Sequence, residues 1–130
     1  HDTSKTAYIH QARPLESNST LMSDAGNLAP FLYRMRRDES RYYDRILSYI
    51  RQVAPFFDNF VLEPFGYSIQ LKFKEKYSDL ELGSFRLSDG TIRFIALATL
   101  LLQPKSTLPK IIIIDEPELG LHPMAIDILS

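Results

Sequence analysis

The 130-residue sequence has no cysteine, no long apolar run and almost no net charge. The absence of cysteine excludes disulfide scaffolds, cysteine-ligated zinc and thiol catalysis, and is compatible with a reducing compartment. The longest strongly apolar run, Phe94 to Leu102, is far shorter than the ~20 residues of a membrane helix, so we expect no membrane partner. The formal net charge of −1 predicts no global attraction to nucleic acid, so any such binding has to be local.

The two ends of the chain also lack expected features. Residues His1 to Arg13 contain neither the basic segment nor the apolar core of a signal peptide. Residues Ala125 to Ser130 stop inside a segment with helical character, so we expect the chain to be a piece of a longer protein. The remaining composition, 45% hydrophobic and 24% charged, is typical of one globular domain.

Two helices are predicted in the first half of the chain, after a polar segment that ends near Gly26. Leu28 begins the first helix, and Pro30 fits its first turn. The second is indicated by apolar residues at helical spacing, with Pro55 ending the run: Tyr43, Ile46, Leu47, Ile50 and Val53. Six arginines lie between Arg34 and Arg51, a pattern typical of a solvated helix face. A local phosphate-binding or nucleic-acid surface is the alternative.

Strand signals follow these helices. Phe60 to Leu62 is a short apolar run, and residues 67–74 alternate with inward positions at Tyr67, Ile69, Leu71 and Phe73. Residues 75–85 are expected to turn and pair back. An apolar helix is predicted from Ser88 to Leu102, with Pro104 ending it, and Lys110 to Ile114 is predicted as a strand buried on both faces of a parallel sheet.

Two short motifs carry the chemistry. Ser88 is a good N-cap and Gly90 leaves the backbone open, so the start of this helix is a candidate anion site, although such a sequence is commonly only a cap. Asp115 and Glu116 follow four isoleucines, which places two carboxylates at the end of a buried strand, where open α/β sheets bind ligands. An acidic turn after a core strand is the alternative interpretation of that pair.

The order of the motifs resembles the C-terminal half of an ABC-type ATPase head. Residues 87–91 (Leu-Ser-Asp-Gly-Thr) look like the signature motif, residues 111–116 like the Walker B strand and residues 118–123 (Glu-Leu-Gly-Leu-His-Pro) like the D-loop. The residues of these motifs most resemble those of predicted ATP-binding proteins of the RecF/SMC-like group. That group includes AAA ATPase domain proteins and relatives of the overcoming-lysogeny-defect nucleases. The resemblance is specific over residues 85–123 and weaker over residues 27–73.

The resemblance implies a fold class and a set of roles. The fold implied is α/β, a fragment of a P-loop ATPase head with a mixed sheet and a helical arm, divided into residues 1–26 (loop or strand end), 27–58 (arm), 59–86 (strands) and 87–130 (signature helix, Walker B strand and D-loop). The parent protein would be a cytoplasmic enzyme that hydrolyses ATP with Mg²⁺ in a head-to-head homodimer. Cofactor contacts would come from Ser88, Asp89, Gly90, Gly120 and His122, with Asp115 at the metal and Glu116 as general base.

Two departures from the family pattern qualify this resemblance. Asp89 replaces the second glycine of the transporter signature and Thr91 replaces its glutamine, which argues against a membrane transporter subunit. No Gly-x-x-x-x-Gly-Lys-Ser/Thr occurs, so the P-loop half is missing and the chain alone is expected to be inactive. Gln11 is a candidate for the Q-loop glutamine.

Two other functions remain open on the sequence. The arginines motivate an interaction lobe that binds DNA or a nuclease partner under ATP control, and loss of salt-dependent DNA binding on Arg36→Ala with Arg37→Ala would support it. A metal-dependent hydrolase using Asp115 and Glu116 lacks the further carboxylate or histidine ligands expected nearby. DNA repair, DNA processing or phage defence is the process that the resemblance implies.

Overall fold

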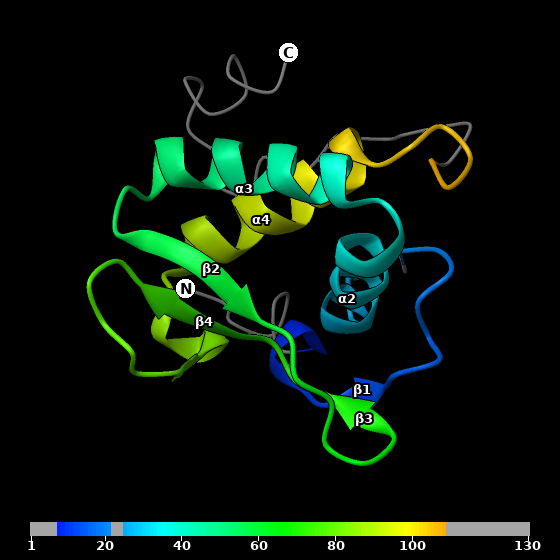
Figure 1. The fold of residues 1–130 in the computed structure, drawn as a ribbon, viewed down its shortest axis with the longest axis horizontal. Coiled ribbons are helices and arrows are strands. Elements are labelled where there is room, and N and C mark those ends of the chain that lie inside the picture. Colours follow the sequence, from blue (N-terminus) through cyan, green and yellow to red (C-terminus); the bar gives the residue numbers. More distant parts are fainter. Residues whose placement is uncertain (1–7, 22–24, 109–130) are drawn as a thin grey trace.

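The structure is a computed structural model that describes residues 8–21 and 25–108. Its elements, in chain order, are η1 (Tyr8–His10), β1 (Arg13–Pro14), α2 (Leu28–Asp38), α3 (Ser40–Val53), β2 (Phe57–Val61), β3 (Ser68–Ile69), β4 (Lys72–Glu75), β5 (Leu82–Gly83), η2 (Ser84–Arg86) and α4 (Asp89–Leu102) (Figure 1). The predicted strand Lys110 to Ile114, the Asp115–Glu116 pair and the residues 118–123 lie outside the described residues.

The helices α2 and α3 are the two that the apolar spacing predicts. They meet at Glu39, which is both the C-cap of α2 and the N-cap of α3. The Glu39 N–H donates to the carbonyl of Met35 at 2.7 Å, and the Glu39 carbonyl accepts from the amides of Tyr42 and Tyr43. One residue therefore turns the chain between two helices and pairs one end group of α2 and two of α3.

The buried face of α3 differs from the prediction at its last position. Tyr43, Ile46, Leu47 and Ile50 are buried as the spacing requires, but Val53 is 37% exposed. The helix ends at Val53, and the following residue, Ala54, is buried and donates its N–H to Ile50. The periodicity fails there because the chain leaves the helical path one residue before Pro55.

The predicted strand over residues 67–74 is two strands in two different sheets. Strand β3 pairs with β1, whereas β4 lies between β2 and β5, and both sheets are antiparallel. Ile69, Leu71 and Phe73 are buried as predicted, but Tyr67 is 95% exposed, because it precedes β3 in the tight turn that closes on Phe65. The alternation of side chains continues through the break while the backbone changes its pairing partners.

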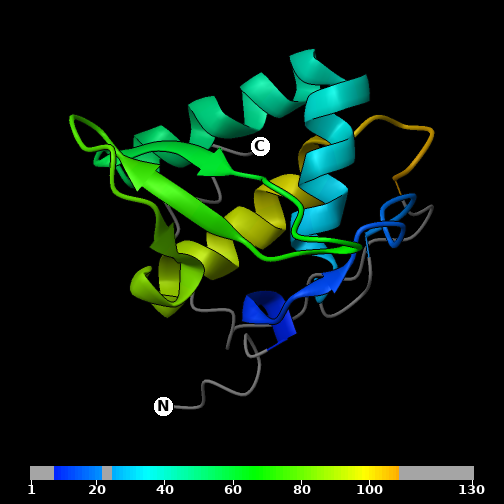
Figure 2. The ribbon, with the colours of Figure 1, turned by 60° about the horizontal axis from the view of Figure 1, so that its bottom comes forward.

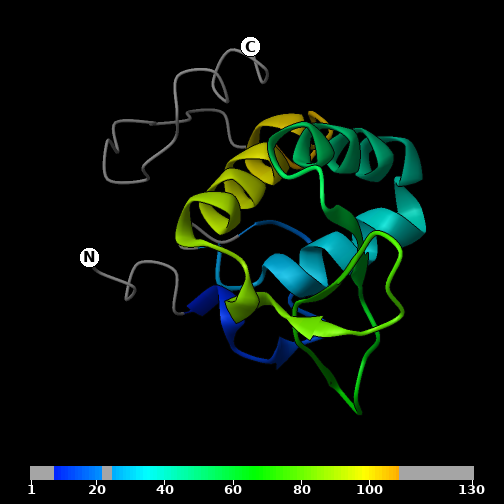
Figure 3. The same cartoon turned by 90° about the vertical axis from the view of Figure 1, so that its left-hand side faces the viewer.

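The return strand predicted within residues 75–85 is confirmed. Strand β5 pairs back onto β4, with Lys72 opposite Gly83 and Phe73 opposite Leu82. Figure 3 shows α3 and α4 side by side, with the three-stranded sheet below them. Both described sheets are antiparallel, and the strand that would make a mixed sheet lies outside the described residues.

Helix α4 packs against α3. Sequence spacing predicts one buried face, but the buried residues cover more of its circumference: Ile92, Phe94, Ile95, Leu97, Ala98, Thr99 and Leu102. Thr99 is buried without penalty because its hydroxyl donates to the Ile95 carbonyl at 2.8 Å. Within residues 8–21 and 25–108, no helix has both the length and the hydropathy that a membrane crossing needs.

Candidate nucleotide-binding site

The first turn of α4 is capped by the side chain of Ser88. The Ser88 Oγ accepts the backbone N–H of Thr91 at 3.1 Å, and the same hydroxyl lies 2.9 Å from the Thr91 Oγ1, to which it donates. Ser88 has extended backbone angles (φ −64°, ψ 156°), as an N-cap requires. Its side chain is exposed, so the predicted cap is confirmed and its oxygen remains accessible from solvent.

Gly90 is open on all sides at the second position of α4. A Cβ built on Gly90 meets no heavy atom within 4 Å, and the residue is exposed. In the part of the chain that the structure describes, its N–H donates to no acceptor. The fold therefore has no steric need for glycine here, and a backbone donor points outward at the positive end of a helix dipole.

Asp89 lies between these two residues but in a different environment. Its side chain is only partly exposed, and its negative charge acts on the imidazole of His10. Burial lowers the pKa of His10 from its usual value of 6.5, and the nearby Asp89 carboxylate partly offsets that effect. The first turn of α4 is thus coupled electrostatically to η1.

The segment that leads into Ser88 is held from two directions. The N–H of Ser84 donates to the Leu71 carbonyl at 3.1 Å, which ties η2 to the sheet. The Oγ of the same buried serine lies 2.7 Å from the Nδ1 of His10. Leu87 is buried and donates its N–H to the Ser84 carbonyl, which holds the chain just before Ser88. Figure 2 shows η2 leading directly into α4.

Sequence reasoning missed His10 and Ser84, because the two residues are 74 positions apart and neither belongs to a motif. The same reasoning treated Tyr8 and Ile9 as a strand end, whereas residues 8–10 form a 3₁₀ turn with Ile9 buried. The His10 carbonyl accepts from the side chain of Gln70, and the Q-loop candidate Gln11 is exposed. No local sequence pattern predicts a hydrogen bond between residues so far apart in the chain, such as the one between His10 and Ser84.

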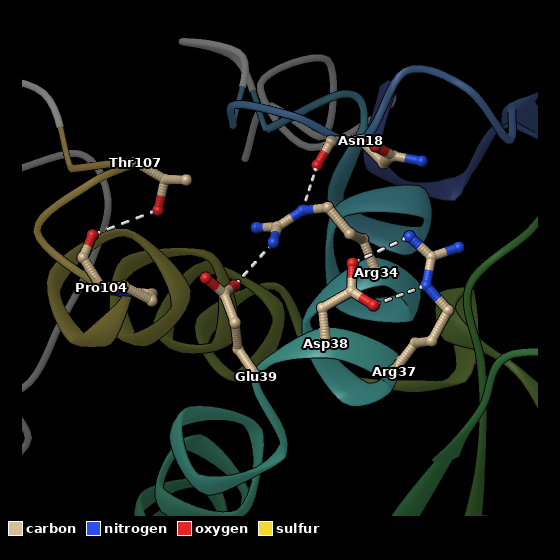
Figure 4. A network of polar contacts seen from close by, with 7 residues as sticks. All are labelled: Asn18, Arg34, Arg37, Asp38, Glu39, Pro104 and Thr107. Carbon is tan, nitrogen blue, oxygen red and sulfur yellow. Dashed lines mark hydrogen bonds and ion pairs between the residues drawn. The ribbon is translucent and has the colours of Figure 1, made fainter.

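A second polar network holds the two arm helices together (Figure 4). The Arg34 Nη1 lies 2.6 Å from the Glu39 Oε1, and its Nε donates to the Asn18 carbonyl at 2.7 Å. Arg34 and Glu39 are 12% and 21% exposed, so this ion pair is largely removed from water. On the neighbouring turn, Arg37 makes a two-point contact with Asp38 at 2.8 and 2.9 Å in full solvent.

The structure gathers three of the predicted site residues into one helical turn: Ser88, Asp89 and Gly90. The others, Asp115, Glu116, Gly120 and His122, lie outside the described residues. Over residues 8–21 and 25–108, no three histidine, aspartate or glutamate side chains group in a way that could hold a metal ion. At this turn the structure presents an exposed hydroxyl, a backbone N–H without an acceptor in the described ranges, and the N-terminal end of a helix dipole, three features that favour an anion.

The model of the family described as "AAA domain, putative AbiEii toxin, Type IV TA system" matches residues 7–130. No curated protein and no solved structure matches the chain at a significant level.

Proposed function

Because the chain belongs to this family of AAA domains, we propose that it forms the signature and Walker B part of a RecF/SMC-like ATPase head. The family places the chain among nucleotide-binding, ATPase-like domains. The finer assignment to an ABC-type head rests on residues 87–123. In a head of this type the P-loop comes from another part of the protein, so the chain supplies only some of the contacts to the nucleotide.

The first turn of α4 is the single observation that carries the proposal. Ser88 presents a hydroxyl there, and Gly90 presents an N–H with open space around it. Both donors suit the oxygens of a terminal phosphate, and the helix dipole favours the same negative charge. We assign this turn to the γ-phosphate of ATP held by the other head of a dimer.

Ser88 can bind phosphate without giving up its role in the fold. Its hydroxyl accepts from the Thr91 N–H and donates its one proton to the Thr91 Oγ1. Turning that proton toward a phosphate oxygen leaves the cap intact, because the cap uses only a lone pair of the Ser88 Oγ. The energy of helix capping and the energy of phosphate binding are thus separable at this residue.

The two acidic residues after the isoleucine run have different roles in this proposal. Asp115 would hold Mg²⁺, and the ion would supply positive charge beside the phosphates. Glu116 orients the attacking water and accepts its proton. Adjacent residues on a strand point to opposite sides, so the two carboxylates do not share one task. Gly120 and His122 belong to the loop that communicates between the two heads.

ATP-dependent dimerisation of the protein in its full natural length tests the role assignment. Light scattering would compare the wild type with Asp115→Asn and Glu116→Gln. We expect Glu116→Gln to retain ATP and a stable dimer while turnover falls by about 10²–10⁴-fold. Asp115→Asn loses nucleotide affinity, so its dimer is weaker. Normal hydrolysis by Glu116→Gln, or a more stable dimer with Asp115→Asn, would show that the roles are wrong.

The 130-residue chain by itself is expected to release no phosphate from ATP at a measurable rate. Its sequence contains no Gly-x-x-x-x-Gly-Lys-Ser/Thr, the loop that supplies most phosphate contacts in such enzymes. Steady Mg²⁺-dependent phosphate release by the purified chain, abolished by Glu116→Gln, would overturn this expectation. The process that the ATPase serves is proposed to be DNA repair, DNA processing or phage defence.

A further inference from the structure

The six arginines of α2 and α3 divide into two groups with different surroundings. Four of them make side-chain hydrogen bonds within the fold: Arg34 to Glu39 and Asn18, Arg36 to the Leu62 carbonyl at 3.2 Å, Arg37 to Asp38, and Arg51 to the Asp58 carbonyl. The remaining two, Arg41 and Arg45, make no hydrogen bond or ion pair with any residue in the described ranges. The two guanidinium groups without a partner in the described ranges therefore both lie on α3.

Arg41 and Arg45 share one exposed region of α3 with an aromatic ring. The two arginines are four residues apart, so their side chains are neighbours on the helix surface. Tyr42 lies beside them and is 40% exposed, and all three residues line one surface pocket. The pocket therefore brings two guanidinium groups and one aromatic ring to the same part of the surface.

This region lies on the side of α3 that faces away from the core. A helix turns by about 100° per residue, so Arg41 and Arg45 fall opposite the buried residues Ile46 and Ile50. The same outward stripe continues with the exposed polar residues Ser48 and Gln52 and contains no acidic side chain. The exposed Asp44 lies at its edge. The stripe spans about 16 Å at 1.5 Å per residue, enough for several nucleotides of a single strand.

We propose that the outer face of α3, formed by Arg41, Tyr42 and Arg45, binds single-stranded nucleic acid. The guanidinium groups contact consecutive phosphates, for which their fork geometry is suited. Tyr42 provides a face on which an unpaired base stacks. An acidic peptide would satisfy the two arginines but would make no use of the ring, and a duplex would keep its bases out of reach of it.

This binding face is distinct from the proposed ATP site. The phosphate-binding turn lies at the start of α4, whereas the nucleic-acid face lies on the solvent side of α3 (Figure 1). The two proposals therefore fail separately: loss of one activity by mutation at its own site leaves the other intact. Mutations that test nucleic-acid binding should therefore be made at Arg41 and Arg45. The guanidinium groups of Arg36 and Arg37 are already hydrogen-bonded within the fold.

The test uses fluorescence anisotropy of a labelled oligothymidylate with the protein in its full natural length. We expect Arg41→Gln with Arg45→Gln to weaken binding and to lower the salt slope by about 1.4, since each phosphate contact on a single strand contributes about 0.7. The matched control is Arg37→Gln with Lys72→Gln, which removes the same charge from two other exposed positions. Binding to the control pair should remain within a factor of about two of wild type, because the general field contributes little at this net charge.

A second pair of variants tests the aromatic contact. Tyr42→Ala should weaken binding by about 5- to 150-fold, the loss of one stacked base, whereas Tyr42→Phe should retain it. Circular dichroism and thermal melting check that each variant is folded. The proposal is overturned if the Arg41 and Arg45 double variant binds like wild type or if the control pair loses as much affinity. It is also overturned if polyglutamate displaces the oligonucleotide as well as unlabelled oligothymidylate does, which would indicate an acidic protein partner.

Discussion

The first turn of α4 and the turns that follow it differ in residue type and in exposure to solvent. From Ile92 onward the helix is mostly apolar, and most of its apolar side chains are buried against α3 and the rest of the core. In the first turn Ser88 and Gly90 are exposed, and Gly90 has open space where a side chain would stand. Packing explains the identity of the later residues, since each contributes buried area. It does not explain the first turn, where the choice of residues is consistent with a ligand that approaches from outside.

The largest difference between the two regions is expected on introducing a charge. Ile95 is fully buried, so Ile95→Asp places a carboxylate without a partner in the core and should cost about 3–5 kcal/mol, enough to unfold a small domain. Gly90→Asp puts the same side chain on the exposed first turn, where the helix dipole favours it. Thermal denaturation followed by circular dichroism compares the two. A cooperatively melting Ile95→Asp variant would show that α4 is not a core element.

A smaller change in stability is expected from substitutions at Ser88, where two variants distinguish helix capping from phosphate binding. Ser88→Ala removes the acceptor for the Thr91 N–H and should lower stability by about 1 kcal/mol, or about 3–5 °C in Tm. Ser88→Asp keeps a capping oxygen and a favourable charge, so its Tm should match or exceed that of wild type. Both variants should lose ATP-dependent dimerisation, Ser88→Asp through repulsion of the γ-phosphate. If Ser88→Asp dimerises normally, the hydroxyl has no role beyond the cap.

The contact between His10 and Ser84 predicts a moderate dependence of stability on pH. Burial holds the pKa of His10 below 6.5 in the folded state, so the unfolded chain binds a proton first as the pH falls. The stability contribution is present above about pH 6.5 and is lost as the pH drops below that value toward the folded-state pKa. Melting curves between about pH 7.5 and about pH 5 should show a weaker pH dependence for His10→Asn than for wild type. An identical slope in the two proteins would count against the buried environment of His10.

The smallest effect on stability is expected at Gly90. An added methyl group meets nothing within 4 Å, and alanine is the better helix former, so Gly90→Ala should change stability by between zero and about 1 kcal/mol in the favourable direction. The same methyl group stands where the γ-phosphate would approach the backbone, and ATP-dependent dimerisation should therefore weaken. Unchanged dimerisation, measured beside an unchanged melting temperature, would falsify the assignment of this turn to phosphate.

Much of the helical structure could be predicted from local pattern. The start of α2, the end of α3 and both ends of α4 lie within a residue or two of their predicted positions, because apolar residues recur at helical spacing and Pro55 and Pro104 limit two of the runs. Strand prediction was less successful. The alternation over residues 67–74 identifies which side chains are buried from Ile69 onward, but not that β3 and β4 join different sheets, since pairing depends on segments far away in the sequence.

The candidate site was predicted in part for a related reason. Ser88 as an N-cap is a local property of the chain, readable from the residues around it. The contact between His10 and Ser84 that supports this turn cannot be predicted from nearby residues. The same holds for the partial burial of Asp89 between two exposed neighbours. The positions of Asp115 and Glu116 stay predictions from the sequence.

The sequence by itself determined the helices, the capped start of α4, the order of the three motifs and the exclusion of cysteine chemistry, because each depends on residues close together in the chain. Only the tertiary structure decided which arginines remain available to a ligand. Arg36 and Arg41 look alike in the sequence, but one reaches the carbonyl of Leu62, 26 residues away, and the other does not reach any acceptor in the described chain. A long side chain finds its partner through the folded arrangement of distant segments, so its availability is a property of the fold and not of its neighbours in the sequence.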